Sequence, residues 1–304
     1  MSRIEWTSET WNPVTGCTRA SEGCDNCYAV TMTRRLAAMG SPKYIGLINE
    51  GKTHFNGVVK CHEDALTIPF KWKKPLMCFV NSMSDLFHKE VPFEFIDKVF
   101  AVMALTPHIT YQVLTKRPER MAEYLNHHAD QSDIGALAMT VGLPENVSRI
   151  LDYDALSWGD IPGNTWPLPN VWLGTSVENQ AAAEERIPHL LQCPAAVRFL
   201  SCEPLIGGVQ LRAINSFHFR GAEMIDALTG DLSDFLGVNV SRLKNSVNWV
   251  IAGGESGAKK RPFNLEWFYS LKDQCKSAGV PFFMKQLDKV QEVPEDLLVR
   301  EYPK

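Results

Sequence analysis

Six short, nearly continuous apolar segments recur along this chain of 304 residues, and segments with helical periodicity separate them. The apolar segments are residues 76–80, 110–114, 171–174, 197–201, 249–252 and 281–284. The helical segments cover about residues 27–40, 93–106, 118–126, 178–192 and 264–278. Short apolar runs are typical of strands buried on both faces, and strands that alternate with helices form parallel sheets. We therefore predict an α/β fold whose parallel sheet is either open or closed into a barrel.

Three longer segments interrupt this alternation, at about residues 44–75, 127–168 and 206–246. We expect a small β-rich insertion in the first and a short helix in the last. The middle segment is rich in Trp, Pro and Gly, and Trp158 and Trp166 are its candidates for a lid over a site. Insertions of this kind are either lids and substrate loops or plain surface decoration. We expect a single domain over residues 1–304. A chain of this length buries roughly 75% of its unfolded surface, so its core needs no disulfide or metal to stabilise it.

The charge balance excludes a sequence-wide basic surface. Lys and Arg number 31 and Asp and Glu 35, so the net charge is 31 − 35 = −4 at pH 7. The chain shows no apolar signal peptide, and its longest uncharged run, 99–115, is interrupted by Pro107 and does not resemble a membrane span. Eight cysteines in such a chain indicate a reducing cytoplasm, where clustered thiols usually serve metal or redox chemistry. We expect a cytoplasmic protein with no membrane partner.

Polar side chains follow every predicted strand directly. Ligands of β/α folds bind at the carboxyl ends of the parallel strands, so these residues are the first candidates for a site. The candidates are Ser82, Asp85, Lys116, Arg117, Ser176, Glu178, Glu203, Gly253, Gly254, Glu255, Ser256 and Lys285. Their recurrence after six strands indicates one convergent polar site.

The turn at residues 253–257 has the sequence Gly-Gly-Glu-Ser-Gly and allows three interpretations. Its glycines let backbone N–H groups approach an anion or an amino-acid moiety, or they serve only a tight turn. The turn also resembles a nucleophile elbow, which would make Ser256 a hydrolase nucleophile. No histidine follows it, because the last one is His218.

Three cysteines, Cys17, Cys24 and Cys27, lie within a Gly-containing loop with the spacing C-x6-C-x2-C. Thiolates this close can bind a soft metal or a cluster. Three thiolates on a [4Fe–4S] cluster leave one iron open, and that iron can chelate S-adenosylmethionine. Zinc is the competing interpretation, with Cys61 or His62 closing a tetrahedron. Three unrelated buried thiols are the third.

The cysteine loop and its surroundings resemble the phage-encoded three-Cys-motif family, a branch of the radical S-adenosylmethionine-like enzymes found in phages and mobile elements. The resemblance is carried by 11–13 (WNP), 16–17 (GC), 23–24 (GC), 27–29 (CYA), 84–87 (SDLF), 114–118 (LTKRP), 174–179 (GTSVEN), 201–205 (SCEPL), 253–257 (GGESG) and 282–286 (FFMKQ). It covers nearly the whole chain outside the insertions. It implies a partial (β/α) barrel of about six or seven parallel strands, with the cluster loop after the first strand. Two features depart from the common radical-enzyme pattern: the usual loop is C-x3-C-x2-C, and the usual Gly-Gly-Glu follows the second strand.

A radical S-adenosylmethionine enzyme, the hypothesis that this resemblance favours, would use the strand-end residues as follows. Cys17, Cys24 and Cys27 would hold a [4Fe–4S] cluster. Ser82 and Asp85 would accept the methionyl ammonium of S-adenosylmethionine, Ser176 would bind ribose, and Gly253, Gly254, Glu255 and Ser256 would face the methionyl or adenine part. Glu178, Glu203 and Lys116 are the candidate catalytic residues, and Arg117 and Lys285 the candidate substrate ligands.

The leading functional hypothesis is therefore a radical S-adenosylmethionine enzyme that generates a 5′-deoxyadenosyl radical to modify or repair a substrate. The phage context suggests a nucleic-acid base or nucleotide, which Lys116, Arg117, Lys259, Lys260 and Arg261 could meet through its phosphates; a small molecule is the other substrate class. The alternative from another class is a zinc-stabilised, non-catalytic binding protein that acts with a protein partner. A hydrolase using Ser256 is the third hypothesis.

Overall fold

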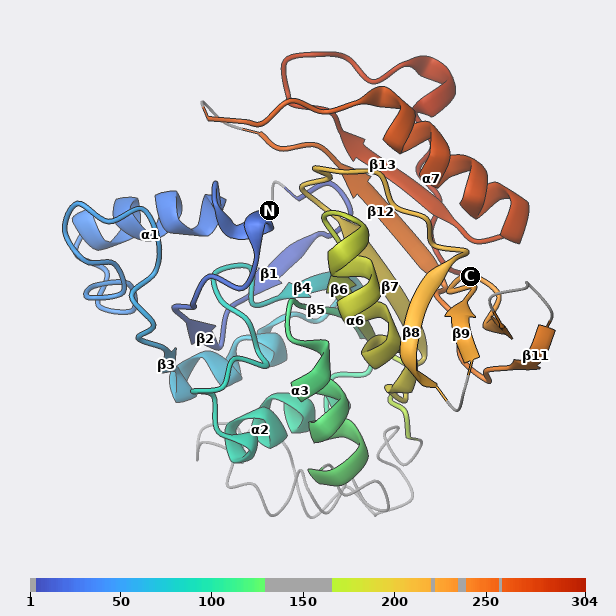
Figure 1. Ribbon diagram of the computed structural model, residues 1–304. Coiled ribbons are helices and arrows are strands. Elements are labelled where there is room, and N and C mark those ends of the chain that lie inside the picture. Colours follow the sequence, from blue (N-terminus) through green and yellow to red (C-terminus); the bar gives the residue numbers. More distant parts are fainter. Residues whose placement is uncertain (1–3, 129–165, 220–221, 235–238, 257–258) are drawn as a thin grey trace. The chain divides into compact units, whose positions relative to one another are not determined.

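A computed structural model describes residues 4–128, 166–219, 222–234, 239–256 and 259–304 (Figure 1). Its main sheet has seven strands in the hydrogen-bonded order β1-β4-β5-β6-β7-β12-β13. These are β1 (Glu9–Trp11), β4 (Leu76–Val80), β5 (Ile109–Thr115), β6 (Val171–Ser176), β7 (Val197–Cys202), β12 (Trp249–Gly253) and β13 (Phe282–Gln286). The strands are parallel, which confirms the predicted α/β class and is consistent with a partial (β/α) barrel with insertions.

The predicted helices are all present. They are α1 (Tyr28–Ala38), α2 (Phe93–Ala104), α3 (Pro118–Glu123), α6 (Gln180–Gln192) and α7 (Leu265–Ala278). Local signals set their ends: the side chain of Asn179 accepts from the N–H of Ala182 at the start of α6, and Asn264 caps α7 in the same way. Gly279 ends α7 in the left-handed conformation.

The chain divides into two compact units. The first comprises Met1–Ala20, Cys27–Trp172 and Pro194–Ala196, and the second comprises Ser21–Asn26, Leu173–Cys193 and Val197–Lys304. The expectation of one domain over residues 1–304 stays a prediction, and the two units are described in turn.

In the first unit, β1, β4 and β5 pair in parallel, with Cys78 opposite Tyr111 in the register of β4 and β5. Tyr111 is fully buried, and most of α2 is buried with it. Asn81 follows β4 with φ 60°, and its side-chain oxygen accepts from the N–H of Val14. This left-handed residue turns the chain at once, so the loop that begins with Ser82 leaves from the carboxyl end of β4.

In the second unit, β12 lies between β7 and β13. Trp249 of β12 is fully buried and packs against Phe199 and Phe283, with ring centroids 5.9 and 6.1 Å away. Helix α7 lies along β12 and β13 (Figure 1). The aromatic core of this unit therefore packs three neighbouring strands together near their amino-terminal and middle parts.

The insertions differ from expectation. Residues 206–246 contain no helix in their described part but an antiparallel sheet in the order β11-β10-β9-β8, so the predicted short helix is wrong. Its strands are β8 (Ile214–Phe219), β9 (Ala222–Ile225), β10 (Asp231–Ser233) and β11 (Asn239–Arg242). They were missed because polar residues interrupt them, as in the Asp-Leu-Ser of β10, and because β9, β10 and β11 are only three or four residues long. The first insertion is not β-rich: it holds the two-residue β3 (Lys60–Cys61), paired with β2 (Val14–Thr15), and two 3-10 turns, Glu63–Thr67 and Pro69–Lys71.

Both lid candidates, Trp158 and Trp166, belong to the middle insertion, residues 127–168. Trp158 is outside the described residues. Trp166 packs against Phe100 of α2, with ring centroids 6.2 Å apart. Within the part of the chain that the structure describes, no helix combines the length and apolar character needed to cross a membrane.

The approach of β6 to β7 gives a test of the fold. A Cβ atom on Gly174 would come within 2.6 Å of the Phe199 ring. We expect Gly174→Ala to lower the free energy of unfolding by about 1–3 kcal/mol, because the buried ring cannot withdraw without disturbing the core. Urea unfolding measures the change. Gly208→Ala is the matched control, because its Cβ would meet Trp267 at an ordinary 3.4 Å, and an equal loss in both variants would contradict this packing.

Candidate functional site

Asp85 organises the polar residues of the first unit. It is 5% exposed, and donors fill both of its carboxylate oxygens. Oδ1 accepts from the hydroxyl of Thr115 at 2.7 Å and the N–H of Phe87 at 3.0 Å. Oδ2 accepts from the N–H of Lys116 at 3.0 Å and from Arg117 Nη1 at 2.8 Å. The carboxylate therefore joins the loop after β4 to the end of β5, and its bonds favour a structural role over ammonium binding.

Arg117 links this carboxylate to the cysteine loop. Its Nη2 donates to the carbonyl and hydroxyl oxygens of Thr18, at 3.1 and 2.8 Å, and its Nη1 lies 3.8 Å from the Sγ of Cys17. Burial alone would lower the pKa of Arg117, but the charges of Asp85 and Cys17 raise it above its usual value. A guanidinium at this distance stabilises a thiolate at Cys17.

His88 lies beneath the same loop and is fully buried. Its Nδ1 accepts from the N–H of Glu90 at 3.2 Å, so the neutral ring carries its proton on Nε2, which lies 2.9 Å from the Thr18 hydroxyl. Burial, aided by the charge of Arg117, lowers the pKa of His88. The sequence analysis missed His88 and Thr18; the position of His88 three residues after Asp85 was the available signal.

Ser82 and Lys116 complete the predicted residues of the first unit. The hydroxyl of Ser82 donates to the side-chain oxygen of Asn12 at 3.1 Å, and its carbonyl accepts from the hydroxyl of Tyr28. The Ser82 hydroxyl oxygen thus keeps lone pairs for a donor. Lys116 is half-buried, and its ammonium has no ion-pair partner among the described residues.

Glu178 of the second unit is fully buried with Arg186. Their side chains are 1% and 2% exposed, and Arg186 Nη1 donates to Oε2 of Glu178 at 2.8 Å. Arg186 also donates to the carbonyl of Ser176, which is itself buried. The hydroxyl of Ser21 donates to the other oxygen of Glu178. No sequence signal marked Arg186, which sits inside a helix.

Glu203 and Lys285 form an ion pair after β7 and β13. Lys285 Nζ lies 2.8 Å from Oε1 of Glu203, and the two side chains are 19% and 13% exposed. Gly253 leaves room for this carboxylate, since a Cβ there would come within 2.4 Å of it. The structure thus brings together three predicted residues, and their charges remain partly open to solvent.

The rest of the Gly-Gly-Glu-Ser-Gly turn binds its own chain. Gly254 donates to the carbonyl of Gln286 at 3.0 Å. Glu255 accepts from Arg261 Nη2 at 2.7 Å and from the side chain of Asn26 at 3.0 Å. Burial would raise the pKa of Glu255, but the bonds from Arg261 and Asn26 hold it below its usual value. Ser256 is half-exposed, and it makes no hydrogen bond to a histidine among the described residues.

The three cysteines of the loop are half-exposed. Among the described residues, no group of three His, Cys, Asp or Glu side chains is arranged to hold a metal ion. Cys61 and His62, the candidates for a fourth zinc ligand, are poorly suited to bind zinc. Partial burial and the charge of Glu63 raise the pKa of Cys61 to about 11. Nε2 of His62 lies 2.8 Å from the Thr15 hydroxyl and is engaged there. A high thiol pKa disfavours the thiolate that zinc requires.

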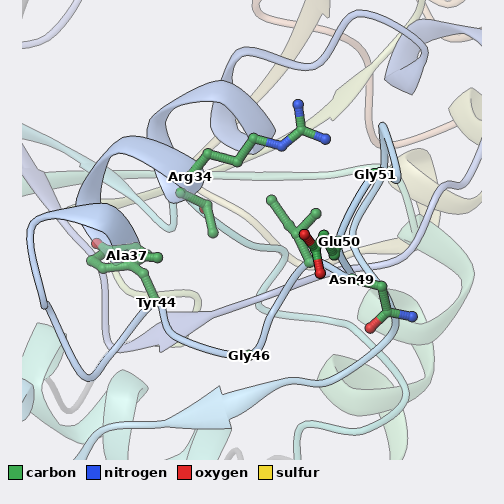
Figure 2. Close-up of a pocket in the computed structure, with 9 residues that line it drawn as sticks. Arg34, Ala37, Tyr44, Gly46, Asn49, Glu50 and Gly51 are labelled. Carbon is green, nitrogen blue, oxygen red and sulfur yellow. The ribbon is translucent and has the colours of Figure 1, made fainter.

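A pocket of about 220 Å³ opens in the first unit, away from the predicted residues. It lies between α1 and the loop that follows (Figure 2). Its lining residues are Thr33, Arg34, Ala37, Tyr44, Gly46, Ile48, Asn49, Glu50 and Gly51. None of them follows a strand of the main sheet, so the strand-end residues do not contribute to this pocket.

The lowered pKa of His88 predicts a pH dependence of stability. Below about pH 6.5 the unfolded chain takes up a proton at this imidazole, while the folded protein resists it. The free energy of unfolding should therefore decrease as the pH falls through this range. We expect His88→Gln to flatten the decrease between about pH 7.5 and about pH 5.5 in urea unfolding. A slope equal to that of the wild-type protein would contradict this account of His88.

Comparisons place the chain in a family without giving it an activity. The profile of the family described as "Protein of unknown function (DUF5131)" matches residues 1–297. No curated protein and no solved structure matches the chain. Since the match spans nearly the full length, the chain belongs to the DUF5131 family.

Proposed function

We propose that this protein is a radical S-adenosylmethionine enzyme in which Cys17, Cys24 and Cys27 hold a [4Fe–4S] cluster. The observation that carries the proposal is the guanidinium of Arg117, 3.8 Å from Cys17 Sγ and fixed by the buried Asp85. A cation held beside a thiol favours the thiolate, which is the form that ligates iron. If Arg117 served only as an ordinary ion-pair partner of Asp85, it would need no contact with Cys17, the first cysteine of the motif.

The donor chemistry fits such a cluster. Three thiols are soft ligands, and three of them leave one iron free for an exchangeable ligand. Each is half-exposed, so a cluster and a small cofactor can reach them. When bound, the reduced cluster and S-adenosylmethionine would together supply a 5′-deoxyadenosyl radical that abstracts hydrogen from substrate.

The chain's own residues would bind and orient the reactants. The hydroxyl of Ser82 would accept from the methionyl ammonium, while Asp85 would hold Arg117 in place. The Glu203–Lys285 pair offers a carboxylate for ribose hydroxyls and an ammonium for a substrate carboxylate or phosphate. Lys116, whose ammonium has no ion-pair partner among the described residues, would meet the substrate. The thiol chemistry requires a reducing compartment, so we place the protein in the cytoplasm.

Iron content tests the cluster. We expect the anaerobically purified protein to be brown and to contain about four iron and four sulfide ions per chain. Cys24→Ala should lose most of this iron and its visible absorbance, whereas Cys61→Ala, the exposed control outside the motif, should keep both. With a reductant, the wild-type protein should release 5′-deoxyadenosine from S-adenosylmethionine. A colourless protein with stoichiometric zinc, or a fully loaded Cys24→Ala variant, would refute the proposal.

The substrate that we propose is a nucleotide or nucleic-acid base, and the ion pairs limit how its phosphates are bound. Arg117, Lys260 and Arg261 are already paired with carboxylates, the latter two with Asp288 and Glu255. Of the five cations predicted to meet phosphates, Lys116 and Lys259 remain without an ion-pair partner among the described residues.

A filter-binding salt series tests this substrate class. With two unpaired cations we expect log Kd to change with log salt by a slope of about 2 or less, since each phosphate contact contributes about 0.9. Lys116→Gln and Lys259→Gln should each lower the slope by about one, and the exposed control Lys74→Gln should not. Absence of binding even at low salt would exclude nucleic acid and leave a small molecule as substrate.

A further inference from the structure

We propose that Glu178 and Glu255 are positioning residues whose carboxylates hold the two ends of the Ser21–Asn26 segment and so fix the place of Cys24. Both glutamates follow strands of the second unit, and the segment belongs to that unit too. The consequence of this positioning for metal binding rests on the proposed function. Its consequence for the reactivity of the Cys24 thiol is independent of the proposed function.

Glu178 holds the first end of the segment. Serine is a preferred residue before a helical turn, where its side chain usually caps the N–H groups of that turn. Ser21 precedes the 3-10 turn Glu22–Cys24 but makes no such cap, and its hydroxyl donates to Glu178 instead. Gly23 brings the backbone close to the same carboxylate, because a Cβ there would be 3.0 Å from its Cδ.

Arg186 makes Glu178 a rigid anchor. The two side chains are fully buried, and both Nη atoms of Arg186 donate to the carboxylate of Glu178. A buried charge must keep its partner, so Glu178 is held where Ser21 meets it.

Glu255 holds the other end. Its Oε2 accepts from the side chain of Asn26, and Arg261 donates to both of its oxygens. Asn26 also donates to the carbonyl of Lys259 at 2.9 Å.

Arg261 connects Glu255 to the middle of the segment. Its Nη1 donates to the carbonyl of Glu22 at 3.0 Å and lies 3.8 Å from the carboxylate of Asp25. Residues on both sides of Cys24 are therefore tied to one or the other glutamate. Of the three cysteines, Cys24 is the one that lies within this segment.

This arrangement makes a chemical prediction for Cys24. The Cys24 thiol is only half-exposed in the closed segment. Opening the segment exposes the thiol fully, and each hydrogen bond to a charged acceptor opposes that opening. Ser21→Ala or Asn26→Ala should each raise the rate of Cys24 alkylation by about tenfold. Both variants leave the Glu178–Arg186 pair intact, which replacement of Glu178 would not.

The experiment uses the full chain without metal, alkylated with iodoacetamide and followed cysteine by cysteine by peptide mass spectrometry. Cys61, which is exposed and lies in the first unit, is the internal reference. Ser21→Thr keeps the hydroxyl and should restore slow alkylation. Glu22→Gln is the control within the segment, since its side chain makes no hydrogen bond among the described residues.

An unchanged Cys24 rate in the Ser21→Ala/Asn26→Ala double variant would overturn the proposal, as would an equal rise at Cys61. Iron analysis of the same proteins separates the two proposals. A wild-type protein without iron whose Cys24 rate still responds would refute the cluster and support the positioning. A loaded wild-type protein should lose iron or change its visible spectrum in the double variant, and a double variant with the same iron and spectrum would overturn the positioning.

Discussion

The cost of burying a carboxylate governs this structure. A charged group taken out of water must be matched by donors, and Asp85, Glu178 and Glu255 are each matched almost completely. The donors come from segments far away in the chain: Ser21 and Glu178 are 157 residues apart, and Asn26 and Glu255 are 229 apart. Each buried charge therefore fixes a loop onto the end of a strand, and the cysteine loop is fixed in this way within each unit.

The sheet could be predicted well because its physical signal is local. A strand covered on both faces has to be apolar along its length, and six runs of that kind correspond to β4, β5, β6, β7, β12 and β13. Strand β1 gives no such run, since its three residues are Glu9, Thr10 and Trp11. The insertion sheet was missed for the same reason: β10 and β11 are short and mostly polar, and only their pairing makes them strands.

The candidate site was predictable in its members but not in its connections. The carboxyl ends of parallel strands had to carry the polar residues, and Asp85, Glu178, Glu203 and Glu255 are all found there. The cation or hydroxyl that binds each carboxylate is determined by contacts between segments far apart in the sequence, and no local sequence pattern encodes these contacts. Arg186 shows this most clearly, because an arginine inside an amphipathic helix ordinarily faces solvent. The internal pairing also changes the roles that fit the acids. Asp85, Glu178 and Glu255, whose carboxylate oxygens all accept hydrogen bonds, hold structure, while Glu203 and Lys285 keep solvent contact.

The hydrogen bonds around Thr18 have a consequence for recognition. The hydroxyl oxygen of this residue accepts from Arg117 and, through the proton on Nε2, from His88, so both of its lone pairs are engaged. Its hydrogen cannot turn back toward either donor and has to point away from them. A serine or threonine rotor normally loses rotational entropy when a ligand stops it. In this protein the hydroxyl of Thr18 is already held in one orientation before any ligand binds. It therefore presents, beside Cys17, one hydrogen-bond donor whose direction is set by the tautomer of His88.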